Sequence, residues 1–509
     1  MNSLITGIKK NKPLLVVLLF GLAFSLRLYG IEHQNIWFDE SYSWNETLRS
    51  TSQIIIHAAT SDVHPPLYYV LLKFWVVLWG DSTAAMRSLS LLFTMGSMGF
   101  AYLIMKQLKN DKALLLGCLL LAISPYQIYF AQEIRMYSLL ALLNTASVYF
   151  YLKLADSQWK GNLLIVGFIA ATLLGLYTHL AALVTFGGIA FHFFYELIFG
   201  NFEPANKKKL FVKFCLTSLS IAILYLPWII VLWYFQAGNV GEQAWRDGVT
   251  IFDGLYELSH VITSVFLGMY FKERILLSYD ILSKHFTWSV YSIYVSDVVL
   301  YIANAAIVLF LTGKSLKSTR KHSLLTFAFF VPLIVTCVIL VVVRKHYDLS
   351  RYLFSLSPIL IILFAIAINE LRQNIKTIVT AAIVAVSLIC LLKYYSTTAR
   401  DSDHRPVADV LTQLAESTDK VFLSPASINH MYRYYLRNGS LKNSLLPLAE
   451  DGHINASECA AVPDVWLAMD YRSEVYAQKP ENLMDSLAGF KMPITYDFFR
   501  TKLVHWVRK

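Results

Sequence analysis

Charged residues are scarce in this chain of 509 residues: 15% are Asp, Glu, Lys or Arg, whereas 56% are hydrophobic. An ordinary soluble domain carries about 25% charged residues. The composition therefore argues against a soluble globular protein and favours an integral membrane protein. Several uninterrupted apolar runs have the roughly 17 to 25 residues that a helix needs to cross the hydrocarbon core.

Other features are missing as well. The chain has 5 cysteines, and four of them (Cys118, Cys215, Cys337 and Cys390) fall in apolar runs, which argues against a disulfide framework and a cysteine metal site. There is no internal repeat and no glycine-rich loop between a strand and a helix, so no nucleotide site is expected. The net charge of +10 would suggest nucleic acid in a soluble protein. Here the lysines cluster beside apolar runs, and no nucleic-acid partner is expected.

The apolar runs predict about eleven membrane-spanning helices. Their ranges are 13–29, 84–105, 113–131, 136–152, 162–178, 180–199, 211–235, 290–312, 323–343, 352–370 and 375–394. Lys and Arg cluster in alternate loops, such as "KQLKNDK", "KLADSQWK" and "GKSLKSTRK". Loops of this kind stay in the cytoplasm, so we expect a cytoplasmic N-terminus and an extracytoplasmic C-terminus. The short outer turns and the lack of disulfides favour the cytoplasmic (inner) membrane of a bacterium.

Residues 65–80, "PPLYYVLLKFWVVLWG", do not fit as a span because the run is short and has Lys73 in its middle. A crossing here would also carry every later lysine cluster to the outer face. We therefore expect an amphipathic helix in the membrane interface, beginning at Pro65 or Pro66. Long outer loops remain at 30–83 and 236–289, with short outer turns at 131–136 and 344–351.

The chain divides into two predicted domains. Residues 1–394 form the transmembrane domain, and residues 395–509 form a small extracytoplasmic α/β domain. The tail alternates a helix at "RPVADVLTQLAE", a strand at "KVFLS", a helix at "INHMYRYYLRN" and a strand at "VWLAMD".

This predicted membrane topology brings acidic and basic side chains to the outer ends of the spans. They are Asp39, Glu40, Asp62, His64, Gln132, Glu133, Arg135, His179, Arg344, His346, Asp348 and Arg351. Singly, an Arg or His at a span end commonly anchors the helix at the interface. Asp39 alone could also cap a helix at "ESYSWNETL".

Together, these residues favour a reaction site. A carboxylate near an apolar surface can act as a general base, and nearby cations can hold an anionic leaving group. Lipid-linked phosphate is the anion expected at this depth, and Arg binds it through two hydrogen bonds.

The stretches "FDESYSW", "DVHPPLYYVLLKFWVVLWGDSTAAMRSLSLLF", "SPYQIYFAQEIRMYSLLAL" and "GLYTHLAAL" resemble a known group of membrane enzymes. These are the polytopic lipid-linked-sugar glycosyltransferases of the GT-C class, including protein O-mannosyltransferases and aminoarabinose transferases, as in glycosyltransferase family 39. "SRYLFSLSPIL" resembles them more weakly, and the tail is not covered. The resemblance implies inverting transfer of a hexosyl or pentosyl group from a polyprenyl-phosphate donor to a hydroxyl of an envelope lipid, glycan or protein.

The same resemblance implies roles for particular residues. Asp39 matches the catalytic base, and Glu40 matches a companion acid that orients the acceptor or Asp39. His64 and His179 stand where relatives carry Lys, so both are expected at the donor phosphate. Arg135 suits that phosphate too.

Three positions complete the implied site. Glu133 is expected to pair with Arg135 or to bind sugar, and Arg351 is expected to bind substrate. Val63 replaces an acid of the aminoarabinose enzymes, so their metal site is not implied. The metal requirement stays open, and no other cofactor is expected.

Two other functions fit a polytopic protein of this kind. A transporter or flippase of lipid-linked sugars would have ionisable groups near the middle of spans and repeated, broken helices. A non-catalytic envelope scaffold would tolerate replacement of Asp39. The charges singled out above lie at span ends, which favours the enzyme.

Overall fold

The computed structural model describes residues 11–62, 64–200, 204–236, 260–269, 288–317, 322–343, 349–448, 452–454, 459, 462–484 and 489–509. The chain folds into two compact units. The first comprises Met1–Ile31, Ser50–Gly80 and Ala84–Tyr394. The second comprises Glu32–Arg49, Asp81–Thr83 and Tyr395–Lys509, so two short segments of the predicted first loop fold with the tail.

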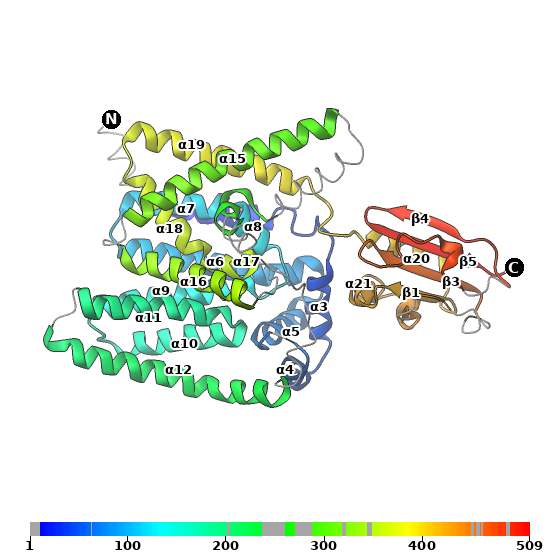
Figure 1. Ribbon diagram of the computed structural model, residues 1–509, viewed down its shortest axis with the longest axis horizontal. Coiled ribbons are helices and arrows are strands. Elements are labelled where there is room, and N and C mark those ends of the chain that lie inside the picture. Colours follow the sequence, from blue (N-terminus) through cyan, green and yellow to red (C-terminus); the bar gives the residue numbers. More distant parts are fainter. Residues whose placement is uncertain are drawn as a thin grey trace. The chain divides into compact units, whose positions relative to one another are not determined.

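The first unit is helical (Figure 1). Its helices are α2 (Lys12–Leu28), α4 (Thr51–Thr60), α5 (Leu67–Trp79), α6 (Thr83–Gln107), α7 (Asp111–Ile123), α8 (Pro125–Ala131), α9 (Tyr137–Asp156), α10 (Asn162–Thr178), α11 (Ala181–Phe199), α12 (Lys207–Gln236), α15 (Trp288–Lys317), α16 (Ser323–Val343), α17 (Leu349–Leu353), α18 (Ser357–Asn369) and α19 (Gln373–Tyr395). Short 3-10 turns lie at Pro204–Asn206 and Phe354–Leu356.

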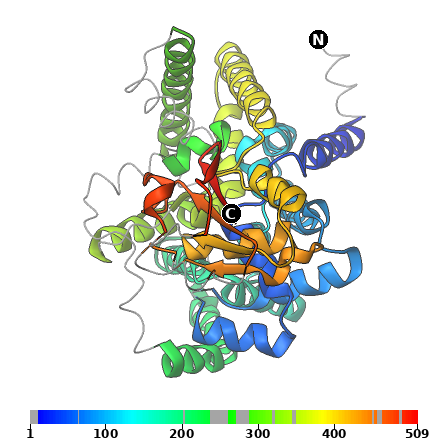
Figure 2. The same cartoon turned by 90° about the vertical axis from the view of Figure 1, so that its right-hand side faces the viewer.

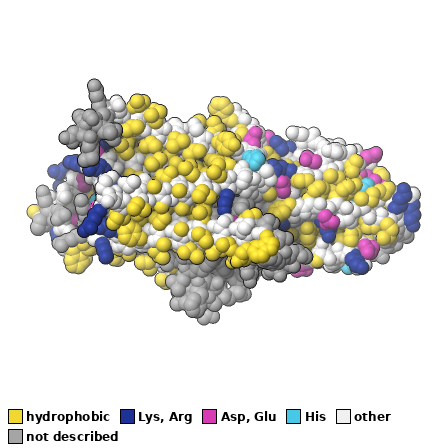
Figure 3. Space-filling view, turned by 90° about the horizontal axis from the view of Figure 1, so that it is seen from above, with side chains coloured by type: hydrophobic (Ala, Val, Ile, Leu, Met, Phe, Trp, Pro, Cys, Tyr) yellow, Lys and Arg dark blue, Asp and Glu magenta, His cyan; other side chains and the backbone are white. Residues whose placement is uncertain are grey.

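Within the described residues, seven helices are long and apolar enough to cross a membrane, and the bent pair α7 and α8 would make an eighth. Shorter apolar helices are Leu67–Trp79, Asn162–Thr178 and Ser323–Ile339. Large apolar side chains such as Leu163 and Leu392 are exposed on these helices, and Figure 3 shows many hydrophobic side chains on the one face of the helical unit that it draws. This protein is an integral membrane protein, and the predicted polytopic helical fold is confirmed.

A break between α7 and α8 bends the pair by 54°. Pro125 is the first residue of α8 and has no N–H to continue the hydrogen bonds of α7, so carbonyls at the end of α7 lose their helical partners. The buried Arg27 of α2 replaces those partners. Its Nη2 donates to the carbonyl of Leu121 at 2.9 Å, and its Nη1 donates to that of Ala122 at 3.4 Å.

The predicted interfacial run forms α5, which begins at Leu67, just after the two prolines. The N-terminal half of α5 buries Tyr68, Tyr69 and Leu72, whereas apolar residues near its C-terminal end, such as Val77 and Leu78, are exposed. Its depth in the membrane remains a prediction.

The predicted loop 236–289 is described only at 236, 260–269 and 288–289. Residues 260–267 are helical and buried. Ser124 Oγ donates to the carbonyl of Val265 at 2.6 Å, and Asn304 Nδ2 donates to that of Thr263 at 3.0 Å. This piece of the loop is thus packed into the first unit.

The second unit contains a five-stranded sheet, drawn as the orange and red arrows of Figure 2. Its strands are β1 (Lys420–Ser424), β2 (Leu445–Pro447), β3 (Asp464–Asp470), β4 (Ile494–Phe498) and β5 (Thr501–Val507), in the order β2-β1-β3-β5-β4. The strand pairs β1–β2 and β1–β3 are parallel, whereas β3–β5 and β4–β5 are antiparallel. The helices of this unit are α3 (Phe38–Thr47), α20 (Arg405–Leu414) and α21 (Asn429–Tyr435).

The sheet is covered on both faces, because alternate side chains of β1 and β3 belong to two separate hydrophobic clusters. Val421 and Trp466 pack with residues of α20 and α21, whereas Phe422 and Leu467 pack with the loops. The predicted small α/β domain is confirmed, together with its two helices and the strands β1 and β3. The strands β2, β4 and β5 were not predicted.

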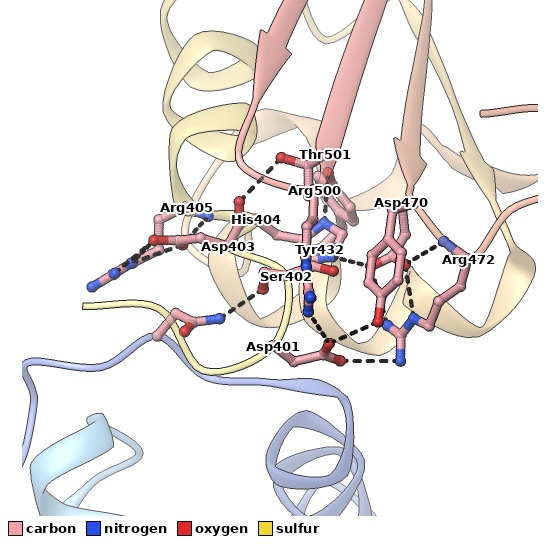
Figure 4. Close-up of polar contacts among 12 residues, drawn as sticks. Asp401, Ser402, Asp403, His404, Arg405, Tyr432, Asp470, Arg472, Arg500 and Thr501 are labelled. Carbon is pink, nitrogen blue, oxygen red and sulfur yellow. Dashed lines mark hydrogen bonds and ion pairs between the residues drawn. The ribbon is translucent and has the colours of Figure 1, made fainter. Parts of the chain in front are cut away.

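A polar network crosses this apolar core (Figure 4). His404 and Asp470 are fully buried, and His404 Nε2 lies 3.1 Å from Asp470 Oδ2. Arg472 donates to Asp470 Oδ1 from its backbone N–H at 2.9 Å and from Nε at 2.7 Å. Burial alone would raise the pKa of Asp470, but the hydrogen bonds from His404 and Arg472 outweigh it and hold that pKa well below its ordinary value.

This network predicts acid sensitivity of the second unit. A carboxyl whose pKa is lowered by folding stabilises the fold fully above its ordinary pKa, and this contribution is lost as the pH falls from the ordinary pKa toward the lower pKa of the folded state. We expect the second unit to lose on the order of 2 kcal/mol between about pH 5 and pH 2. Hydrogen exchange of β3 peptides should detect the loss. In Asp470→Asn, β3 should exchange faster at neutral pH, and its stability should depend less on pH. An unchanged pH dependence of stability in this variant would contradict the role given to the Asp470 carboxylate.

Candidate active site

In the first unit, acidic and basic side chains gather where helices end. Asp62 follows α4 and His64 precedes α5. Arg135 lies in the turn between α8 and α9, and His179 lies between α10 and α11. The fold brings together three of the predicted site residues, His64, Arg135 and His179, and Asp62 lies with them.

Asp62 is the centre of this group. Its Oδ1 accepts hydrogen bonds from the backbone N–H and from Nδ1 of His64, both at 3.1 Å. Burial alone would raise the pKa of Asp62, but the bonds from His64 and the charge of Arg135 outweigh it and hold that pKa well below its ordinary value. Because ionised Asp62 only accepts, His64 must donate from Nδ1, and Nε2 is the ring nitrogen that can meet a ligand.

His179 is a neutral neighbour of this pair. Its ring centroid lies 5.2 Å from that of His64 and 4.8 Å from that of Tyr352. Burial and the nearby positive charges of His64 and Arg135 lower the pKa of His179 well below its ordinary value. The backbone N–H of Ala181 donates to His179 Nδ1 at 3.0 Å, so the neutral ring carries its proton on Nε2. His179 can therefore donate one hydrogen bond from Nε2.

Arg135 brings a positive charge into this buried group. It is only 5% exposed, and its Nη1 donates to the hydroxyl of Tyr69 at 3.3 Å. Glu133, in the same turn, is 1% exposed, and its backbone carbonyl accepts a hydrogen bond from Ser90 Oγ at 2.6 Å. The turn thus carries one buried acidic side chain, Glu133, and one buried basic side chain, Arg135.

Gln132 fixes the turn that carries Arg135. Its Nε2 donates to the carbonyls of Arg27 and Tyr29, both at 2.8 Å, and its Oε1 accepts from the hydroxyl of Tyr394 at 2.9 Å. The turn is therefore tied to the end of α2 and to the end of α19. Such a rigid support suits a site whose groups must hold a fixed geometry.

The predicted base and its companion lie in the second unit, on α3. This helix begins at Phe38 after the N-cap residue Trp37, so Asp39 and Glu40 are in its first turn. The alternative that Asp39 caps the helix is wrong, because the helix begins one residue before it. Both acids lie at the positive end of the helix dipole, which stabilises their negative charge.

The two acids differ in exposure and partners. Asp39 is partly exposed, whereas Glu40 is fully buried. Glu40 Oε1 lies 3.9 Å from Nη1 of Arg400, a residue that the sequence analysis did not select. No local pattern could have found Arg400, because it is distant in sequence and meets Glu40 only through the fold.

The remaining predicted site residues have fewer defined contacts. Arg351 lies in α17 and is partly exposed, next to Tyr352, whose ring is tilted by 40° against that of His179. Arg344, His346 and Asp348 lie outside the described residues. In the part of the chain that the structure describes, no group of three or more His, Cys, Asp or Glu side chains could hold a metal ion.

The first unit also has an apolar cavity of about 530 Å³. Its walls come from α10, α11 and α12, and they include Leu176, Leu180, Leu183, Tyr225 and Trp233. His179 does not line this cavity, but the next residue in the chain, Leu180, does.

Comparison with known proteins relates this arrangement to a family and a fold. Residues 63–235 match the family of dolichyl-phosphate-mannose-protein mannosyltransferases. That range contains His64, Glu133, Arg135 and His179, whereas Asp39 lies outside it. No curated protein sequence matches the chain significantly.

Solved structures share the fold at low sequence identity. ArnT from Cupriavidus metallidurans, bound to undecaprenyl phosphate, matches with a TM-score of 0.62 and 13% identity, over 96% of this chain and 97% of that chain. The apo state of the same protein gives 0.60 and 12%, with the same coverage.

The archaeal oligosaccharyltransferase AglB from Archaeoglobus fulgidus, in complex with an inhibitory peptide and a dolichol-phosphate, is also similar. It matches with a TM-score of 0.53 and 13% identity, over 91% of this chain and 70% of that chain. The family match and the shared fold agree with the resemblance found in the sequence: residues 63–235 are similar to the mannosyltransferase family, and the chain has the fold of ArnT and AglB.

Proposed function

We propose that this protein is an inverting glycosyltransferase. It moves a hexosyl or pentosyl group from a polyprenyl-phosphate donor to a hydroxyl of an envelope lipid, glycan or protein, on the outer face of the membrane. The observation that carries the proposal is the buried group of Asp62, His64, Arg135 and His179, in a unit that also has an apolar cavity lined by Leu180, the residue after His179. ArnT bound to undecaprenyl phosphate and AglB bound to a dolichol-phosphate share the fold, which supports a lipid-linked donor.

In this proposal, Arg135, His179 and His64 bind the phosphate of the donor. Arg135 supplies a permanent charge and paired N–H donors, which suit two phosphate oxygens. His179 donates from Nε2 without adding a charge, and His64 presents Nε2 because Asp62 holds its other nitrogen. A leaving phosphate that gains negative charge is stabilised by such preorganised donors.

The polyprenyl chain occupies the apolar cavity in this proposal. The cavity is lined by Leu, Ile and aromatic side chains, and it lies on helices whose other apolar residues are exposed. An isoprenoid chain gains about 0.8 kcal/mol for each buried CH₂ group. A donor held by both its chain and its phosphate needs no nucleotide pocket.

Asp39 is the general base. It takes the proton of the acceptor hydroxyl while that oxygen bonds to the anomeric carbon of the sugar. The bond from this carbon to the phosphate oxygen breaks at the same time, and polyprenyl phosphate leaves with the electron pair. Attack opposite the leaving group inverts the anomeric carbon. Glu133 and Arg351 are assigned to the sugar or its phosphate, and Glu40 supports Asp39.

One observation favours the transporter alternative. Asp297 of α15 is fully buried and forms an ion pair with Lys393 of α19, between two candidate spans. Paired charges inside a membrane often mark a transport path. Lys393, however, lies in the last turn of α19, at a span end. The experiment on Asp39 separates the two functions, because a transporter does not need this base.

The first prediction concerns the base. Asp39→Asn keeps the volume of the side chain but cannot accept a proton, so we expect sugar transfer to fall by about 100-fold or more. The measurement is mass spectrometry of envelope glycolipids and glycans in cells lacking the protein, complemented with each variant at matched protein level. Glu46→Gln changes a carboxylate of the same helix that pairs with Arg49 at 3.1 Å, and it should restore the product. Full restoration by Asp39→Asn would refute the enzyme proposal.

The second prediction concerns the phosphate site. Arg135→Gln removes a charge that makes hydrogen bonds to the donor, so we expect donor affinity to fall by about 10- to 100-fold. Binding of undecaprenyl phosphate to the purified protein, followed through its effect on the melting temperature, measures the loss. Arg135→Lys keeps the charge but lacks the paired N–H donors, so its affinity for undecaprenyl phosphate should lie between those of Arg135→Gln and wild type. Undiminished binding in Arg135→Gln would exclude the phosphate role.

A further inference from the structure

The helix that carries the two acids is held by the C-terminal part of the chain, within the second unit. Arg433 Nη1 donates to Asn45 Oδ1 at 3.1 Å, and Trp44 packs edge-on against Tyr434 with ring centroids 5.2 Å apart. Tyr42, three residues after Asp39, meets His430 with centroids 5.7 Å apart. One side of α3 therefore lies against α21.

Arg400 contacts the start of α3 and the residues that precede this helix. It is 5% exposed, and besides the ion pair with the buried Glu40 its Nε donates to Gln34 Oε1 at 3.1 Å. Its backbone N–H donates to Asn35 Oδ1. An opposite charge beside a buried acidic side chain offsets the cost of its burial, and Arg400 places such a charge beside Glu40.

The residues after Arg400 are anchored to the sheet (Figure 4). Asp401 pairs with Arg472 at 3.1 Å and with Arg500 at 3.7 Å. His404 pairs with the buried Asp470 of β3. We call residues 400–405 the clasp, because this segment joins the acids' loop segment to β3 and to the hairpin of β4 and β5.

The backbone is unusual at Asp401 of the clasp and at Arg500 of the hairpin turn. Asp401 has φ of 60° and Arg500 has φ of 58°, in the left-handed region that favours glycine. The side chains of these two residues form an ion pair. Conformations of this kind persist only where the surroundings determine them, which indicates that the clasp has one defined arrangement.

We infer that Arg400 is a positioning residue for sugar transfer and that the α/β domain, through the clasp, holds the catalytic turn in place. The inference rests on the proposed function, in which Asp39 is the base. Asp39 and Glu40 are adjacent in the first turn of α3, so fixing the carboxylate of Glu40 fixes the turn that presents Asp39. Arg400 acts through Glu40 and does not touch substrate.

The test compares Arg400→Gln, Arg400→Lys, Glu40→Gln and the double variant Glu40→Gln/Arg400→Gln, all in the full chain. Three quantities are measured: the melting temperature, its shift with undecaprenyl phosphate, and the transferred sugar in complemented cells at matched protein level. We expect Arg400→Gln to lower the product at least tenfold while the shift with undecaprenyl phosphate stays unchanged. Arg400→Lys keeps the charge and should recover most of the product.

The double variant separates positioning from mere stability. Removing both charges should return the melting temperature to that of Glu40→Gln, because no unpaired charge remains, and the product should be no lower than in Glu40→Gln alone. Product at wild-type level in the double variant or in Arg400→Gln would overturn the inference. The inference would also fail if the loss of product in the double variant equalled the product of the two single losses. Such independence is not expected of two residues that act through each other.

A matched control and the base variant complete the design. Lys502→Gln removes a different ion pair of the same unit, with Asp497 at 3.6 Å, and should leave the product unchanged. If Asp39→Asn is inactive while Arg400→Gln is fully active, the clasp inference fails and the proposed function stands. If Asp39→Asn is fully active, the proposed function itself fails.

Discussion

Charged side chains lose their hydration when they are buried, and both units of this protein are organised around compensating that loss. Arg27 is fully buried and meets the carbonyls that a proline leaves without partners. Glu40 is paired with Arg400, and Asp470 is paired with His404 and Arg472. A buried charge that loses its partner also lacks water to replace it, so these contacts restrict where the attached loops and turns can lie.

The sequence predicted the helical architecture well because hydrophobic length is a local signal. It also predicted β1 and β3, which are short runs rich in apolar residues that flank helices. The hairpin of β4 and β5 was missed for a physical reason. Its turn places Arg500 at positive φ, where hairpins usually carry Gly or Asn, so the turn gave no sign in the sequence.

The site was predictable in one part and hidden in another. His64, Arg135 and His179 all lie at span ends on the face chosen by the lysine distribution, and topology alone brings such positions together. The grouping of α3 with the tail has no comparable signal. It depends on contacts such as that of Tyr435 with Ile36, which join residues at opposite ends of the chain and follow from side-chain packing alone.

The presence of Asp62 in a group proposed to bind phosphate follows from the same constraint. Arg135 is a buried cation, and Asp62 supplies a negative charge close enough to act on it. The same carboxylate holds Nδ1 of His64 and so decides which nitrogen faces a ligand. His179 stays neutral and can donate a hydrogen bond without adding a second charge that would need compensation. Asp62 thus offsets the charge of Arg135, and neutral His179 adds no charge. His64, Arg135 and His179 still have N–H groups that can donate hydrogen bonds to an anion.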